Sequence, residues 1–182
     1  MNIIGKRFSP DEFWGYAAQT IGEASWKGSF VVLHNTGSPT LAQRPSGLTS
    51  EHITNLRLYY EDLGWHAGPH LFIDQNGIWV FSPLTAPGVH SPSWNHVSYG
   101  VEQLGDFDRE AYTSGPGALV RANAISALAA LHHAACIDSA TLKLHRMDPK
   151  TTHRDCPGAH CADEFEQIMR DVHAAVVARE QV

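Results

Sequence analysis

The amino-acid sequence predicts a single α/β (α+β) domain, in which helices flank a central mixed β-sheet of about five or six strands. Apolar runs of strand length within residues 29–34, 69–81, 98–105 and 142–145 alternate with segments whose apolar residues recur at helical spacing. The chain has 182 residues, 43% of them hydrophobic, which is enough for one full core. No repeat, low-complexity tract or linker divides it, so residues 1–182 are expected to form one domain.

Helices are predicted at four places. Ser9 is an N-cap, Pro10 occupies the first helical position and Glu12 completes a capping box, which together predict a helix over about 9–21. The other three follow from apolar residues at helical spacing and lie at about 50–63, 116–136 and 160–179.

The predicted strands differ in character. Residues 29–34 form a continuous apolar run, as expected of a strand that is covered on both faces. Two strand-like runs flank the Asn-Gly pair at 76–77, so a β-hairpin is predicted over 69–81 with that pair as its turn. The predicted strand 98–105 contains Glu102, and a carboxylate among apolar strand residues is unusual enough to mark a candidate for chemistry.

Composition excludes several classes of function. The net charge of −6 and the absence of a long basic run argue against a nucleic-acid partner. No apolar stretch reaches membrane-spanning length, so no integral membrane association is expected. The N-terminus turns acidic before an apolar signal region can form, which predicts a cytoplasmic location in the producing cell. Three irregularly spaced cysteines suit a reduced compartment better than a disulfide framework, and a monomer is expected.

Residues 142–158 concentrate the groups that bind metals. Imidazole and thiolate are preferred ligands of Zn²⁺, and a catalytic zinc usually has three protein ligands and one open position. His145 and Cys156 can supply two ligands, and His34 is the best candidate for the third. His34 and His145 each end a strand-like run, so both imidazoles emerge at one sheet edge if those strands are neighbours. His153 lies three residues from Cys156 and remains a rival for the second ligand position.

Simpler interpretations stand beside this one. His34 can be a hydrogen-bonded core histidine, Cys156 a small buried apolar residue and Glu102 a structural ion-pair partner. The chain lacks a G-x-S-x-G elbow, an H-E-x-x-H helix and a P-C-x-x-C deaminase motif, so those hydrolases fit the sequence less well. A cysteine-nucleophile amidase remains formally open.

Four separated motifs resemble the zinc-dependent N-acetylmuramoyl-L-alanine amidases, a family that covers phage endolysins, bacterial cell-wall amidases and animal peptidoglycan-recognition proteins. They are HNTGSP, WHAGPHLFIDQNGIW, GVHSPSWN…SYGVEQLGD and LHRMDPKTTHRDCPG, and the resemblance covers roughly residues 28–165. It implies a groove across one face of a mixed sheet, with Zn²⁺ at its floor. The substrate implied is peptidoglycan or a muropeptide, cut between N-acetylmuramic acid and L-alanine.

The resemblance implies a role for single residues. It places zinc on His34, His145 and Cys156, and it matches Glu102 to the glutamate that some members use as general base. Arg154 stands where many members have a lysine. Two departures are Pro69, where the family often has a tyrosine, and the long interval between His145 and Cys156.

The remaining predicted roles concern the substrate. Glu102 is expected to move a proton from water to the leaving amine, and Arg154 to stabilise the tetrahedral oxyanion as a fixed charge. Substrate contacts in the groove are predicted for His90, Trp94, Asn95 and His153.

The biological setting stays open between alternatives. A phage-type endolysin that reaches the cell wall or periplasm after release is the leading interpretation. A cytosolic enzyme that recycles anhydromuropeptides, a delivered toxin and a non-catalytic peptidoglycan-binding module are the others. The cysteine-type ligand favours an enzyme over the binding module.

Overall fold

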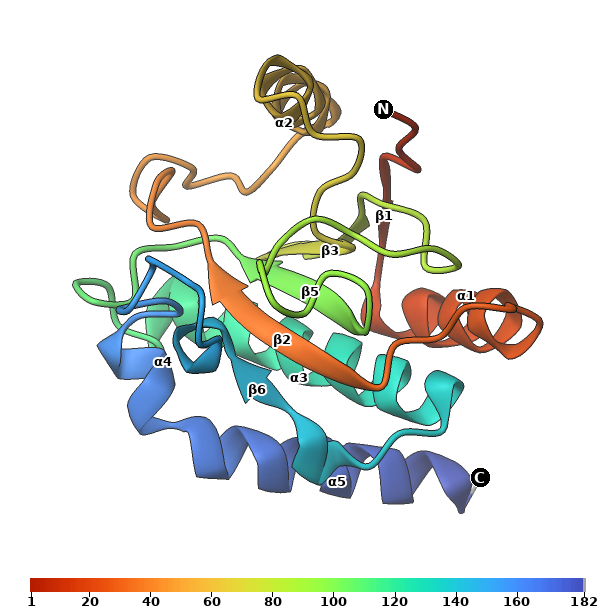
Figure 1. Ribbon diagram of the computed structural model, residues 1–182. Coiled ribbons are helices and arrows are strands. Elements are labelled where there is room, and N and C mark those ends of the chain that lie inside the picture. The colour runs from red at the N-terminus through yellow and green to blue at the C-terminus, as the bar shows by residue number, and fades with distance from the viewer. Residues whose placement is uncertain (182) are drawn as a thin grey trace.

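The computed structural model describes residues 1–181 as one six-stranded mixed sheet with helices on both faces, which confirms the predicted fold class (Figure 1). The strand order across the sheet is β1-β4-β3-β5-β2-β6. Strands β2, β3, β5 and β6 pair in parallel, while β1 and the β3–β4 hairpin add antiparallel pairs. The strands are β1 (Lys6–Phe8), β2 (Phe30–Asn35), β3 (Leu71–Asp74), β4 (Gly77–Val80), β5 (Ser98–Gln103) and β6 (Lys143–Leu144).

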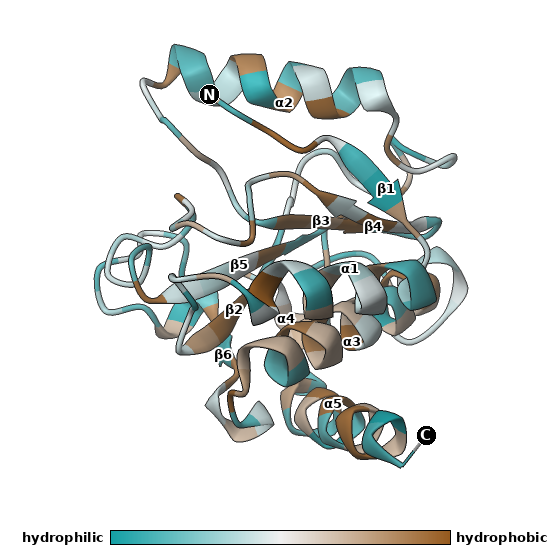
Figure 2. Ribbon diagram, turned by 90° about the vertical axis from the view of Figure 1, so that its right-hand side faces the viewer, coloured by the Kyte–Doolittle hydropathy of each residue, from teal (hydrophilic) through white to brown (hydrophobic). Residues whose placement is uncertain are grey.

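The helices lie in two layers. Helices α1 (Pro10–Gly22), α3 (Gly115–Ala135) and α5 (Phe165–Glu180) cover one face of the sheet, and α2 (Ser50–Asp62) lies over the other (Figure 2). Helix α3 is central to its layer and rich in alanine, so it approaches the strands closely. Helix α2 buries little of its surface, with Ile53 its one fully buried residue, so the space beneath it stays open. The face under α2 is therefore where a ligand can enter.

The start of α1 follows the predicted capping box. Ser9 Oγ accepts a hydrogen bond from Glu12 N, while Glu12 Oε2 accepts one from Ser9 N at 2.8 Å. Phe13, Ala17 and Ile21 recur on one face of the helix and are fully buried. The helix predicted over 9–21 is thus confirmed to within a residue at each end.

The hairpin is present, but its predicted turn is displaced by one residue. Strand β3 ends at Asp74 and β4 begins at Gly77, so the loop residues are 75–76 rather than the Asn-Gly pair. The cause is the buried Asp74 carboxylate, which accepts hydrogen bonds from Asn76 N at 2.7 Å and Leu48 N at 2.7 Å. Gly77 instead allows strand β1 to pair closely with β4, because a Cβ at position 77 would lie 2.6 Å from Phe8 O.

Two other elements differ from expectation. The single helix predicted over 160–179 is divided into α4 (Ala159–Asp163) and α5, because Glu164 N bonds to Cys161 O and tightens the chain between them. Strand β1 was not predicted, since three residues on a sheet edge are too few to show a periodic pattern. In the described residues, no helix is both long and apolar enough to cross a bilayer.

His70 is a fully buried histidine whose two nitrogens are both engaged. Nδ1 accepts a hydrogen bond from Gly100 N at 3.0 Å, and Nε2 donates to Ala86 O at 3.0 Å. The ring also stacks on Trp26, with centroids 5.6 Å apart. Burial is the main cause that lowers the pKa of His70 from its ordinary 6.5 to about 4.

This pKa predicts an acid-sensitive fold. The unfolded chain takes up a proton at His70 near pH 6.5, and the folded chain does so only near pH 4. The contribution of neutral His70 to the free energy of unfolding is therefore fully present above pH 6.5 and is lost as the pH falls toward 4. In chelator, the unfolding free energy of a His70→Gln variant should fall less than that of the wild type between pH 7.5 and 4.5, by roughly 2–3 kcal/mol. Urea denaturation at both pH values measures this, and equal losses in the two proteins would contradict it.

Candidate active site

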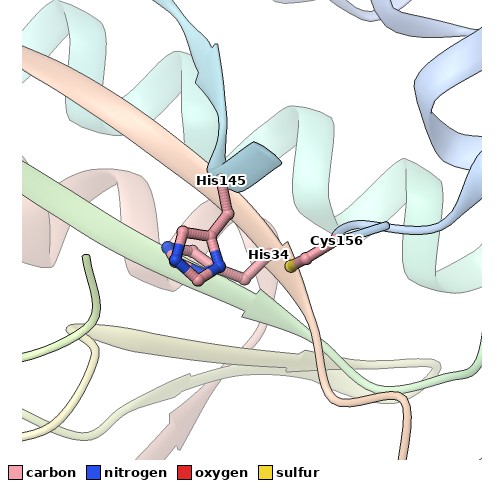
Figure 3. Close-up of side chains that lie close together, drawn as sticks. All are labelled: His34, His145 and Cys156. Carbon is pink, nitrogen blue, oxygen red and sulfur yellow. The ribbon is translucent and has the colours of Figure 1, made fainter. Parts of the chain in front are cut away.

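Strand pairing brings His34 and His145 to one edge of the sheet. Strands β2 and β6 are parallel neighbours with Leu33 opposite Leu144, and the next residue along the chain is a histidine in both cases, His34 within β2 and His145 directly after β6. The two imidazole centroids lie 4.2 Å apart. Cys156 approaches from a loop, and one ligand atom from each of these three residues lies within 4.8 Å of the other two (Figure 3). This is the arrangement expected of a three-ligand metal group.

Arg146 holds the loop that carries Cys156. Its backbone N and its Nε both donate to Cys156 O, at 3.0 and 3.2 Å, and its Nη2 donates to Asp155 O. Because Arg146 directly follows His145, the second histidine and the thiol are tied to the same short segment. The long interval between His145 and Cys156 is therefore folded into a compact loop.

The chemistry of the three donors fits a metal ion. Burial is the first cause that lowers the pKa of His34 well below its usual range and that of His145 to about 4, so both rings are neutral bases with a free lone pair. Burial raises the pKa of the Cys156 thiol, so a cation at this point is what favours its thiolate. All three cysteines are free thiols.

Glu102 lies beside this group. Strands β2 and β5 are parallel with His34 directly opposite Glu102, which places the carboxyl group at the same edge as the two imidazoles. Desolvation raises the pKa of Glu102 to about 8. A carboxyl group with a pKa near neutrality can both accept and return a proton, which is the property a general acid–base requires.

These groups lie at the floor of an open groove of about 890 Å³. Its walls come from α2, the loop after β2 and the loop that carries Cys156. The wall residues are Leu56, Tyr59, Tyr60, Leu63, residues 34–39 and residues 152–156. Both aromatic and polar side chains line the groove.

Arg154 and His153 line the groove, as predicted for residues that contact a substrate. The Arg154 guanidinium donates to Asp148 O and Pro149 O, both at 3.2 Å, which fixes its charge at the groove wall. His153 is exposed, and its ring stacks on His145 with centroids 5.6 Å apart. The structure leaves His153 outside the three-residue metal group.

Of the three residues predicted within 90–95, His90 lies in the groove, and Trp94 and Asn95 lie elsewhere. His90 lines the groove but is mostly buried, with Nδ1 3.1 Å from His34 Nε2. Asn95 caps the loop, since its Oδ1 accepts from His90 N and Ser91 N at 2.7 Å. Trp94 packs edge-on against Phe30. In the part of the chain that the structure describes, Trp94 and Asn95 do not line the groove. The packing of Trp94 and the hydrogen bonds of Asn95 give both residues a structural role that needs no substrate.

Sequence reasoning missed several residues that support the site. Besides Arg146, Thr151 Oγ1 lies 2.9 Å from His145 Nε2. Gln103 Nε2 donates to His34 O at 3.2 Å, and its Oε1 accepts from Tyr112 Oη at 2.7 Å. The only signal in the sequence was their position next to predicted ligands or to Glu102.

The fold and the site define a class of protein: single-domain α/β enzymes with a His–His–Cys group suited to a metal ion and a carboxylic acid at the floor of a groove. The family model for N-acetylmuramoyl-L-alanine amidases matches residues 25–159. The chain belongs to this family, and it is accordingly an amidase that acts on peptidoglycan. No curated protein sequence matches the chain.

Solved structures show the same fold. The N-acetylmuramoyl-L-alanine amidase LysC from Clostridium intestinale URNW is similar with a TM-score of 0.65 and 22% identity, over 81% of this chain and 87% of that one. Drosophila PGRP-LB gives a TM-score of 0.63 at 21% identity, over 79% and 82% of the two chains. A mutant endolysin from Bacillus subtilis gives 0.59 at 20% identity, over 80% and 86%.

Proposed function

We propose that the protein is a zinc-dependent hydrolase that cuts the amide bond between N-acetylmuramic acid and the L-alanine of the stem peptide. The observation that carries this proposal is the His34, His145 and Cys156 group, whose ligand atoms lie within 4.8 Å of one another at the floor of the groove. Two imidazoles and a thiolate are a preferred donor set for zinc, and they leave a fourth position open. When bound, zinc supplies a Lewis acid that polarises the amide carbonyl and makes water a stronger nucleophile.

The residues of the chain handle the protons and charges. Glu102 takes a proton from the attacking water as the carbon–oxygen bond forms, and gives it to the amine nitrogen as the carbon–nitrogen bond breaks. Desolvation raises its pKa to about 8, and a cation held by His34, His145 and Cys156 would lower that pKa and favour the basic carboxylate. Arg154 faces the negative charge that develops on the carbonyl oxygen, and it can do so only as a fixed cation.

A phage-type endolysin is the setting that we propose, with synthesis in the cytoplasm and action on the wall after release. The support for this setting is that the groove is open at the surface, where part of a larger substrate can enter it. The recycling enzyme acts on soluble anhydromuropeptides instead. The presence of Cys156 in the metal group argues against a module that only binds peptidoglycan.

Product analysis separates these functions. Purified protein is incubated with intact sacculi and, separately, with soluble anhydromuropeptides, and the products are identified by mass spectrometry. We expect free stem peptides from sacculi, and none with a Cys156→Ala variant as the matched control. Cleavage of the soluble substrate alone would indicate recycling, and binding to sacculi without any product would indicate a recognition module.

A further inference from the structure

The hydrogen bonds of His90 determine which of its nitrogens carries the hydrogen. Nε2 lies 3.4 Å from both the carbonyl oxygen and the hydroxyl oxygen of Ser98. The Ser98 hydroxyl donates its one hydrogen to Trp94 O at 2.7 Å, so both Ser98 oxygens face His90 as acceptors. The hydrogen of a neutral His90 therefore lies on Nε2, and Nδ1 keeps a lone pair.

This assignment determines the direction of the next hydrogen bond. His90 Nδ1 lies 3.1 Å from His34 Nε2, and two imidazole nitrogens at that distance share one hydrogen. Because His90 Nδ1 has no hydrogen, His34 Nε2 is the donor. A neutral His34 that is protonated on Nε2 has its lone pair on Nδ1.

Both rings are enclosed by the protein. His34 is 3% exposed and His90 is 9% exposed, and a buried imidazole without a carboxylate partner is held in its neutral form. The chain of donors from His34 through His90 to Ser98 thus holds at neutral pH.

The position of the His90 ring is closely constrained. Its backbone N is bound by Asn95 Oδ1 at 2.7 Å. The ring packs on the backbone of β5 at Gly100, where an added Cβ would lie 2.3 Å from His90 Cγ. Glycine at position 100 is therefore what leaves room for His90 beside the strand that carries Glu102.

We propose that His90 is a positioning residue that fixes the Nε2–H tautomer of His34 and so presents His34 Nδ1 as the metal-binding atom. In the part of the chain that the structure describes, His90 lies beside the metal group and not in it. Residues that accept the second N–H of a metal-binding histidine orient the ring and raise its basicity. The metal half of this inference rests on the proposed function, while the tautomer half does not.

The tautomer is tested on metal-free wild-type protein. Long-range ¹H–¹⁵N spectra of the histidine side chains distinguish Nε2–H from Nδ1–H rings without any metal or substrate. We expect His34 and His90 both to carry hydrogen on Nε2, and added zinc to shift the Nδ1 signal of His34. A metal-free His34 in the Nδ1–H form would overturn the inference, even if no His90 variant could be folded.

Zinc affinity provides the second readout, measured by competition with a chelator. His90→Ala should weaken zinc binding by about 10–100-fold. His90→Asn should recover most of that loss, because the asparagine Oδ1 can accept the hydrogen bond from His34. The matched control is His96→Ala, which removes an exposed histidine of the same loop and should leave the affinity unchanged.

Two outcomes separate this inference from the proposed function. A folded His90→Ala variant with wild-type zinc affinity would show that His90 does not position the ligand. A wild-type protein that binds zinc through His34 Nδ1 but cleaves neither sacculi nor soluble muropeptides would remove the proposed function and leave the role of His90 standing.

Discussion

Replacing His145 by alanine is expected to abolish stoichiometric zinc binding and to lower amidase activity by about 10³-fold or more, because a bound metal supplies several kcal/mol of transition-state stabilisation. His145 follows strand β6 directly and its ring lies 4.2 Å from that of His34, centroid to centroid. A ligand at a sheet edge is held more rigidly than one on a loop. Wild-type protein should hold close to one zinc per chain and lose activity in a strong chelator. Elemental analysis and the sacculus assay measure both effects.

The matched variant is His153→Ala, because His153 was the rival ligand in the sequence. This variant should keep zinc, and its activity should fall roughly tenfold. A tenfold lower rate corresponds to the free energy of about one hydrogen bond to the substrate or the oxyanion. Its ring is exposed and stacks on His145 from outside the metal group. Zinc retained by His145→Ala and lost from His153→Ala would show that the two ligands have been assigned the wrong way round.

A Glu102→Gln variant is expected to keep its fold and its zinc but to lose about 10²–10⁴-fold in kcat, the usual contribution of a general acid–base. Glutamine has nearly the same shape as the carboxylic acid that burial favours, so the neighbouring strands should not move. It cannot accept and return a proton. The measurement is kcat on a soluble muropeptide together with zinc content, and a circular dichroism spectrum confirms the fold.

The control for this variant is Asp106→Asn, which changes another acidic residue that lines the groove. It should stay within a few-fold of wild-type activity, because Asp106 lies outside the metal group. If Glu102→Gln retained nearly full turnover, Glu102 would have a structural role and another group would activate the water.

Local rules account for the parts of the fold that the sequence predicted well. The capping box at Ser9 and the alanine-rich pattern of α3 act over a few residues, so their outcome is readable without tertiary contacts. The hairpin turn shifted by one residue because the Asp74 carboxylate binds Leu48 N, a partner 26 residues away. The break at Glu164 likewise could not be read from the apolar pattern of the last helix.

The sequence by itself determined which chemistry is present: two histidines at strand ends, a cysteine in a polar loop and a carboxylate within a strand. Only the tertiary structure decided which of these groups meet. The order β5-β2-β6 places Glu102 opposite His34 and His145 next to it, although the chain separates His34 from Glu102 by 68 residues and from His145 by 111. The predictions for Trp94 and Asn95 lacked that context, since Trp94 packs on Phe30 of strand β2 and Asn95 bonds to the backbone of its own loop. Pairing of strands so distant in sequence depends on packing across the whole core, and no local pattern records it.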